Sequence, residues 1–288
     1  MQIAVASGKG GTGKTTIAAA LALSLADEHT VRVLDCDVEA PNAHLVLKPV
    51  FDRQAPAVIR IPQIDAERCT ACGKCVLVCQ FHALAKVGKT ILVFTQLCHG
   101  CGSCTWNCPE GAISEVPNQI GKLEAGRTKE DIRFAQGVLT ISEPMPTPVI
   151  RQLKRWDQTS ETDVTILDAP PGASCSVVET LRGSDYALFV TEPTPFGLHD
   201  LKQALGIAQE MNIPAGVVIN RDGIGDDQVD RFLSQNDLPV LLRIPFSKTL
   251  AAGIAAGKSL IEELPEYRSR FKGVFRQIVE SIAEGKSC

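Results

Sequence analysis

The stretch from Gly8 to Thr15 constrains this chain more than any other feature of the sequence. It reads G-K-G-G-T-G-K-T, follows an apolar run at 3–6, and opens into a helix-forming segment. In such a loop, backbone N–H groups and the helix N-terminus surround phosphate oxygens. The pattern predicts that Lys14 reaches the β- and γ-phosphates of a nucleotide and that the Thr15 hydroxyl ligates Mg²⁺. The other residues predicted to surround the phosphates are Gly8, Gly10, Gly11, Thr12, Gly13 and Thr16.

Lys9, directly after the first glycine, narrows the nucleotide-binding class. The form K-G-G-T-G-K-T-T at 9–16 resembles the deviant Walker A loop of the MinD/ParA/Mrp and nitrogenase iron-protein group of ATPases. In that family the early lysine crosses a dimer interface to the partner's nucleotide, and a charge supplied in trans is worth about 10³–10⁵ in rate. The resemblance implies a catalytic Lys9 and a homodimer, or a dimer with a paralogous ATPase. A solvated loop lysine is the alternative.

The composition argues against nucleic acid and membranes as partners. The 288 residues carry a net charge of −4 and no basic stripe, which argues against a nucleic-acid partner. No apolar run approaches the roughly 18 residues of a transmembrane helix, and the first residues show no secretory pattern. We therefore expect a cytoplasmic protein without a stable membrane anchor. Eleven cysteines in such a chain favour metal or redox chemistry over disulfides.

Two further segments end in acids where a buried parallel strand is expected to stop. The run V-R-V-L-D-C-D ends in Asp37, which by position resembles the acid that orients the attacking water in MinD-type ATPases, with Asp35 one alternation earlier. The run V-T-I-L-D ends in Asp168 before A-P-P-G, which resembles the family's Walker B strand and second switch. The resemblance implies that Asp168 holds Mg²⁺ through water and that the Gly172 amide senses the γ-phosphate. A strand-end acid that caps the next turn is the alternative.

Strands and helices alternate through the second half of the chain. Strand-like runs at 186–191, 215–220 and 239–244 are separated by helix-like stretches. The pattern predicts an α/β fold with a doubly wound, mostly parallel sheet that binds ligands at the carboxyl ends of its strands. Asn220, at one such end, resembles the family's adenine-contacting asparagine, and Arg221 and the loop around Pro245 lie where the base would rest. An asparagine after a strand is also an ordinary turn residue.

Eight of the eleven cysteines form two runs of identical spacing. Each run reads C-x-x-C-x-x-C-x-x-x-C, and a proline follows the second. This spacing resembles that of bacterial two-cluster ferredoxins, in which three thiolates of one run and the last of the other hold each [4Fe–4S] cluster. The resemblance assigns the first cluster to Cys69, Cys72, Cys75 and Cys108. It assigns the second cluster to Cys98, Cys101, Cys104 and Cys79.

Zinc is the competing interpretation of the cysteine runs. A repeated triple C-x-x-C-x-x-C followed by a further cysteine is poorly suited to one tetrahedral ion. Gln80 stands where a proline often follows the fourth cysteine, in contrast to Pro109, and this departure concerns loop shape. Trp106 and His99 lie among the predicted ligands. Packing or exposure is the expected role of both, because eight thiolates already complete two sites.

The cysteine runs interrupt the nucleotide-binding part of the chain. We expect residues 1–60 and 119–288 to form a P-loop ATPase domain. Residues 61–118 are expected to form an inserted small α+β, ferredoxin-like domain, with a strand at 89–94 between the two runs.

Several elements are predicted after the insertion. Glycines at 121 and 126 predict a loop over 117–127 as the chain returns, and a β-hairpin is expected to turn at Gln136 and Gly137. A helix is predicted at 147–156. The amphipathic segment at 268–283 is predicted to dock on the ATPase core, because its polar face carries few lysines for anionic lipid.

Three cysteines lie outside the two runs. Cys36 is expected to be a buried small hydrophobe, and Cys175, alone in the second switch, is expected to serve packing. Cys288 is the last residue given and matches no prenylation box.

Together these features predict a Mg²⁺-dependent ATPase. It would bind ATP or ADP, dimerise with nucleotide, and couple its nucleotide state to two [4Fe–4S] clusters, for electron transfer to, or regulation of, a metalloprotein or redox partner. One alternative is an Mrp-type carrier or scaffold that hands clusters to an apoprotein. Another is a Min/Par-type positioning ATPase in which the clusters are structural or sensory.

Overall fold

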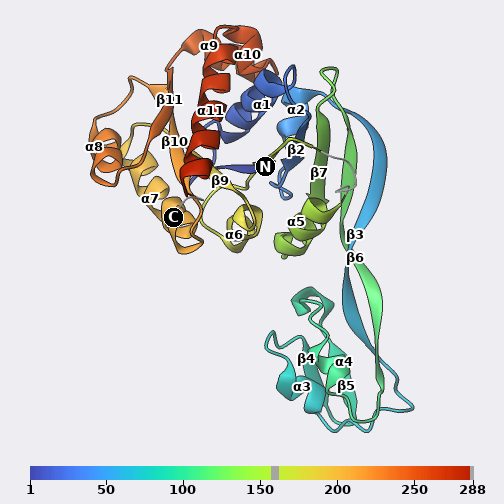
Figure 1. Cartoon of the computed structure of the whole chain (residues 1–288). Coiled ribbons are helices and arrows are strands. Elements are labelled where there is room, and N and C mark those ends of the chain that lie inside the picture. Colours follow the sequence, from blue (N-terminus) through green and yellow to red (C-terminus); the bar gives the residue numbers. More distant parts are fainter. Residues whose placement is uncertain (157–161, 286–288) are drawn as a thin grey trace.

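A nine-stranded sheet forms the centre of the molecule within residues 1–156 and 162–285, the part described by this computed structural model (Figure 1). Its order is β11-β10-β9-β1-β8-β2-β7-β6-β3, and the first seven of these strands are parallel. The α/β fold with a mostly parallel sheet is therefore confirmed. The parallel strands are β1 (Gln2–Ala6), β2 (Val31–Asp35), β7 (Arg133–Leu139), β8 (Val164–Asp168), β9 (Tyr186–Thr191), β10 (Ala215–Asp222) and β11 (Val240–Pro245).

Helices cover both faces of the sheet, so the central strands are apolar throughout. On β1, Ile3 and Val5 pack toward one helix layer, whereas Ala4 and Ala6 pack toward the other. The first layer contains α1 (Lys14–Leu25), α2 (Ala43–Leu47), α9 (Lys248–Ala255), α10 (Leu260–Glu263) and α11 (Tyr267–Gly285). The second contains α5 (Pro146–Arg155), α6 (Cys175–Leu181), α7 (Pro195–Glu210) and α8 (Gln228–Gln235).

The C-terminal helix α11 packs along α1. Phe271, Val274 and Ile278 are buried in the same cluster as the apolar side chains of α1. The prediction that this amphipathic segment docks on the core is confirmed. No helix in the described part of the chain is long and apolar enough to cross a membrane.

Two antiparallel strands extend the sheet at one edge and run well beyond it. The strands β3 (Val50–Ile64) and β6 (Ile113–Arg127) pair along their whole length, and we call the pair the arm. At its far end lie α3 (Lys74–Val78), β4 (Leu84–Val87), β5 (Thr90–Val93), η1 (Thr95–Leu97) and α4 (Ser103–Trp106). Residues 65–112 are called the cysteine module below. Figure 1 shows this module held away from the rest of the molecule, which we call the body.

Two predictions about the segments that follow the cysteine runs are wrong. The expected loop at 117–127 is part of β6, because Gly121 and Gly126 permit close packing in the sheet rather than a turn. A Cβ at Gly126 would lie 1.9 Å from the Val50 carbonyl oxygen. The expected hairpin at Gln136 and Gly137 is the single strand β7. Gly137 is required there because a Cβ would lie 2.7 Å from the Val38 side chain.

Candidate nucleotide cleft and cysteine cavities

A cleft of about 580 Å³ opens at the carboxyl ends of β1, β2, β10 and β11. Its volume is typical of small-molecule sites, and its position is the usual one for ligands of parallel sheets. Most of the residues predicted to bind nucleotide line it. They are Lys9, Gly10, Gly11, Thr12, Gly13, Lys14, Thr15, Thr16, Asp37, Asn220, Arg221 and Pro245.

Three predicted nucleotide-binding residues do not line the cleft. A Cβ on Gly8 would lie 2.1 Å from the Asp200 carbonyl oxygen, so this glycine allows α7 to approach the loop. The Gly172 amide donates to the Ser7 carbonyl oxygen at 3.0 Å and would have to leave it to meet a phosphate. Asp168 is fully buried beneath the loop.

Lys14 and Asp168 form a buried ion pair under the loop. The Lys14 Nζ lies 2.8 Å from Oδ1 of Asp168. Burial opposes the charged form of Lys14, but the Asp168 carboxylate outweighs it and raises the pKa of this lysine. The second oxygen of Asp168, Oδ2, is buried without a hydrogen-bond partner among the described residues. This orphaned oxygen fits a water ligand of Mg²⁺, since Mg²⁺ keeps several waters when it binds to carboxylates.

Asp35 organises the loop after β2 from a fully buried position. It accepts backbone N–H bonds from Asp37, Asn42 and Ala43 at 2.9 to 3.1 Å. Burial, and then the Asp168 carboxylate, raise the pKa of Asp35 to about 7. Burial also raises the pKa of Asp37, whose side chain faces the cleft.

Sequence reasoning missed Glu192, an acid beside the loop. Its carboxylate pairs with Lys9 through Oε1 and with Arg221 through Oε2, the latter at 2.9 Å. Glu192 comes directly after β9, the strand next to β1, so its place at a strand end was the available signal. The side of the cleft formed by α2 and α9 was also missed, because its residues give no pattern beyond that of ordinary helices. These are Leu45, Val46, Leu250, Ala251 and Ile254.

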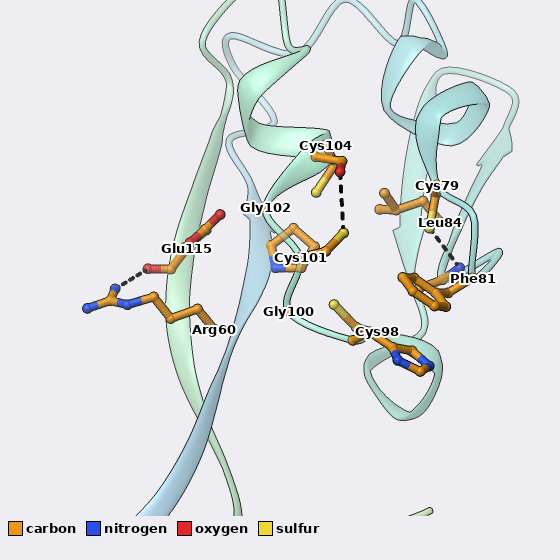
Figure 2. Close-up of a pocket in the computed structure, with 14 residues that line it drawn as sticks. Arg60, Cys79, Phe81, Leu84, Cys98, Gly100, Cys101, Gly102, Cys104 and Glu115 are labelled. Atoms are coloured by element: carbon orange, nitrogen blue, oxygen red, sulfur yellow. Dashed lines mark hydrogen bonds between the residues drawn. The ribbon is translucent and has the colours of Figure 1, made fainter. Parts of the chain in front are cut away.

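Two cavities in the cysteine module are each lined by four cysteines. The proximal cavity is lined by Cys79, Cys98, Cys101 and Cys104, and the distal cavity by Cys69, Cys72, Cys75 and Cys108. These are the two groups of four that the spacing predicts, although their ligation stays a prediction. Figure 2 shows the sulfurs of Cys98, Cys101 and Cys104 on one side of the proximal cavity and that of Cys79 across from them.

The two cavities are built by one repeated backbone design. Backbone N–H groups donate to the sulfurs of corresponding cysteines, from Ala83 to Cys79 at 3.2 Å and from Ala112 to Cys108 at 3.3 Å. Three pairs of corresponding positions also share a left-handed backbone with φ between 52° and 84°. The pairs are Ala71 and Gly100, Gly73 and Gly102, and His82 and Gly111.

Among the residues that the structure describes, no three His, Cys, Asp or Glu side chains are grouped to hold a single metal ion. Burial raises the pKa of the Cys98 and Cys104 thiols, which favours their protonated form.

The proximal cavity lies against the arm. It is lined by Arg60 and Glu115, whereas the distal cavity is lined by Ile64 at the end of β3. A Cβ on Gly100 would lie 3.0 Å from the Arg60 carbonyl oxygen, so a glycine brings the cysteine loop onto the arm. Since β3 runs outward from the body, the proximal cavity is the nearer of the two to the nucleotide cleft.

Two aromatic side chains near the cysteine cavities and the three cysteines outside the runs were also assigned roles from the sequence. Trp106 is 89% exposed, as expected. His99 stacks on Phe81 with ring centroids 3.7 Å apart, but it also lines the proximal cavity, so its role stays a prediction. Cys36 is fully buried, as predicted, and burial raises the pKa of its thiol to about 12. Cys175 is exposed at the first position of α6, so the expectation that it serves packing is wrong. Cys288 lies outside the described residues.

Comparison with known proteins places this architecture in a family. The model of the CobQ/CobB/MinD/ParA nucleotide binding domain matches residues 3–261. An uncharacterized protein of Methanocaldococcus jannaschii is 29% identical over 263 residues, which cover 91% of this chain and 92% of that protein. A protein named as a cytosolic Fe-S cluster assembly factor, the Nubp2 homolog of Anopheles gambiae, is 24% identical over 97% of this chain and 95% of its own length.

Solved structures give the same result for the fold. The septum site-determining protein MinD of Pyrococcus horikoshii, determined with Mg-ADP, superposes with a TM-score of 0.57 at 19% identity, over 96% of this chain and 95% of that one. At such identity the likeness concerns the fold alone. The match of the family model spans residues 3–261, which is most of the chain. The chain therefore belongs to the CobQ/CobB/MinD/ParA family of nucleotide-binding proteins.

Proposed function

We propose that this protein is a Mg²⁺-dependent ATPase whose nucleotide state is coupled to two [4Fe–4S] clusters that exchange electrons with a metalloprotein or redox partner. The observation that carries the proposal is the union, in one chain, of a nucleotide cleft with two cavities of four cysteines each. The protein works in the cytoplasm as a homodimer, or as a dimer with a paralogous ATPase.

The ATPase role rests on the charged groups around the cleft. Lys14 turns from Asp168 toward the β- and γ-phosphates, and Asp168, with the Thr15 hydroxyl, holds Mg²⁺. Asp37 faces the cleft and orients the attacking water. Asn220, tied by its side-chain amide to the Thr12 carbonyl oxygen at 2.7 Å, positions the base together with Arg221 and Pro245. Lys9 neutralises charge on the partner's nucleotide.

The cluster role rests on the cysteine cavities. Each iron of a cluster takes one thiolate, so four sulfurs around a cavity suit a cluster better than a single ion. Backbone N–H groups already donate to Cys79 and Cys108, which stabilises thiolate ligands. When bound, the clusters supply reversible one-electron chemistry. The inserted ferredoxin-like domain comprises residues 61–118, between ATPase parts 1–60 and 119–288.

The coupling between the two sites rests on the arm. The helix α2 lines the cleft, and β3 begins three residues after it. At this joint the Phe51 ring packs edge-on against Phe134, with ring centroids 6.0 Å apart, and is tilted by 57° to the His44 ring, with centroids 6.5 Å apart. A movement of α2 on nucleotide binding is thereby passed to the strand whose outer half packs on the proximal cavity.

The test is to measure the reduction potentials of anaerobically purified protein by a titration followed with electron paramagnetic resonance, with and without Mg-ATP. We expect two [4Fe–4S] signals and a nucleotide-dependent shift of about 60 mV or more, roughly 1.4 kcal/mol for a one-electron couple. The Lys14→Ala variant is the control and should keep both signals without the shift. Protein lacking the signals after reconstitution would contradict the proposal, as would a shift that persists in the variant.

A cluster carrier is the second candidate, and it is favoured by one observation. The similar Anopheles gambiae protein is named as an Fe-S cluster assembly factor. Transfer of iron from the loaded protein to an apo-ferredoxin, faster with Mg-ATP than without, would put this candidate first. A positioning role comes third, and Mg-ATP-dependent binding to lipid vesicles or DNA would support it.

A further inference from the structure

Glu192 is placed between two cations at the front of the phosphate loop. Its side chain is only 7% exposed, whereas those of Lys9 and Arg221 are 31% and 45% exposed. Each carboxylate oxygen is used, Oε1 by the Lys9 ammonium and Oε2 by the Arg221 guanidinium. An almost buried carboxylate thus holds Lys9 inside its own subunit.

Arg221 extends this contact across the loop. Its second guanidinium nitrogen donates to the Gly11 carbonyl oxygen at 3.0 Å, and its backbone has φ 54°, a left-handed conformation that an arginine seldom adopts. Because Arg221 is held from both sides, Glu192 keeps one partner when Lys9 leaves. Release of Lys9 therefore breaks one charge-assisted bond without leaving the buried carboxylate unpaired.

We propose that Glu192 is a positioning residue that retains Lys9 in its own subunit until a nucleotide γ-phosphate across the dimer competes for it. The inference rests on the proposed action of Lys9 in trans. A nucleoside diphosphate lacks the terminal phosphate that would offset the loss of Glu192. The carboxylate thereby restricts dimerisation to the nucleoside triphosphate state.

The Glu192→Gln variant tests this restriction, because glutamine keeps the shape and can still accept from Arg221 while losing the negative charge. Dimerisation of the full-length, cluster-loaded chain is measured by sedimentation velocity over a range of concentrations, with Mg-ADP and with a non-hydrolysable Mg-ATP analogue. We expect the midpoint concentration with the analogue to fall about tenfold, and dimers to form with Mg-ADP. The matched control is Glu179→Gln, which disrupts an ion pair of similar burial with Arg151, away from the cleft.

A second measurement tests retention without any dimer. Nucleotide-free monomer is treated with an amine-acylating reagent, and acylation of Lys9 is quantified by mass spectrometry relative to the exposed Lys129. We expect acylation of Lys9 to rise severalfold in Glu192→Gln and to stay unchanged in Glu179→Gln. Equal acylation of Lys9 in Glu192→Gln and wild type would overturn the inference.

The remaining outcomes separate this inference from the proposed function. If Lys9 is released but dimerisation keeps its dependence on the triphosphate, Glu192 does not impose the restriction and the inference fails. If Lys9→Ala leaves ATP turnover unchanged, the trans action itself fails, while the acylation result still reports whether Glu192 retains Lys9. The double variant Lys9→Ala with Glu192→Gln should dimerise like Lys9→Ala alone. Any gain in dimerisation from Glu192→Gln in that background would overturn the inference.

Discussion

The body and the cysteine module of this protein are stabilised in different ways. The body buries large side chains in two clusters on either side of its sheet, including Tyr186, Phe134 and Phe271. The module's own cluster holds only Cys75, Leu84, Ile91 and Cys104, together with Ile113 of the arm, and the module leaves Leu77 and Trp106 exposed. Segments of this size seldom form a sufficient core without metals or disulfides. We therefore expect the body to fold on apolar packing and the module to depend on the proposed ligands of its cysteines.

The largest expected effect comes from removing cysteines of the module. In Cys75→Ser or Cys104→Ser, we expect loss of iron and loss of amide-hydrogen protection throughout 65–112, because metal binding and folding of so small a core are coupled. Nucleotide binding by the body should be retained. Hydrogen exchange followed by mass spectrometry measures both parts in one experiment. The control is Cys175→Ser, which changes an exposed cysteine of the body and should leave the module protected. Full amide-hydrogen protection of the iron-free module would show that the module folds without iron.

The next effect concerns the body. Lys14→Ala should weaken ATP binding by about 100-fold or more, because the phosphates lose a charge-assisted contact and Asp168 is left without its ion-pair partner. Iron content and module protection should not change. Isothermal titration with ATP and an iron assay on the same sample provide the test, with Lys122→Ala on the arm as the control. A parallel loss of iron would show that the two parts do not fold independently.

A smaller effect is expected from pH. Burial raises the pKa of Asp35 from 3.8 to about 7 in the folded chain, so between these values the folded state holds a proton that the unfolded state has released. The free energy of unfolding should therefore fall as pH rises through about 4 to 7, by no more than about 4 kcal/mol from this group. Denaturant unfolding of nucleotide-free, Mg²⁺-free protein measures the slope. Asp35→Asn should flatten it, and an unchanged slope in that variant would exclude Asp35 as its source.

The smallest effect tests the joint between the two parts. Phe51→Ala removes an edge-on aromatic contact with Phe134 and should cost about 1 kcal/mol of stability. If α2 moves the arm through this contact, the nucleotide-dependent shift in cluster potential should shrink although both sites are intact. Phe94→Ala is the matched control, since the two side chains are exposed to a similar degree at 41% and 43%. If the nucleotide-dependent shift in cluster potential is as large in Phe51→Ala as in wild type, the contact between Phe51 and Phe134 does not couple the two sites.

The sequence predicts those parts of the molecule whose chemistry is local. The phosphate loop and the acids Asp37 and Asp168 follow from patterns within single segments, and the structure places them near one another, with Asp168 below the cleft rather than in it. The cysteine groups follow from the spacing of two runs and its resemblance to ferredoxins, and the structure gathers the same two groups of four. The arm was not predicted, because the first part of β3 is polar and exposed and the glycines of β6 resemble turn residues. Its strands are fixed by pairing with each other and with β7, which is information that no single segment carries.

Glu192 illustrates the same limit at the site. Nothing adjacent to it in the sequence resembles a nucleotide motif, and its importance arises only because β9 lies next to β1 in the sheet. The helices α2 and α9 contribute to the cleft by tertiary contact in the same way. Glu192 could therefore have been predicted as a site residue only if the order of the strands in the sheet had been known.

The crossed arrangement of the cysteine runs has a consequence for biosynthesis. Cys79, which ends the first run, faces the three leading cysteines of the second, and Cys108 in turn faces those of the first. A chain emerging from the ribosome thus carries three sides of the distal cavity early but cannot close either cavity until the second run has followed. With the proposed ligation, the clusters could be completed only after the whole insertion has been translated, and a chain truncated before Cys108 would retain an open distal site.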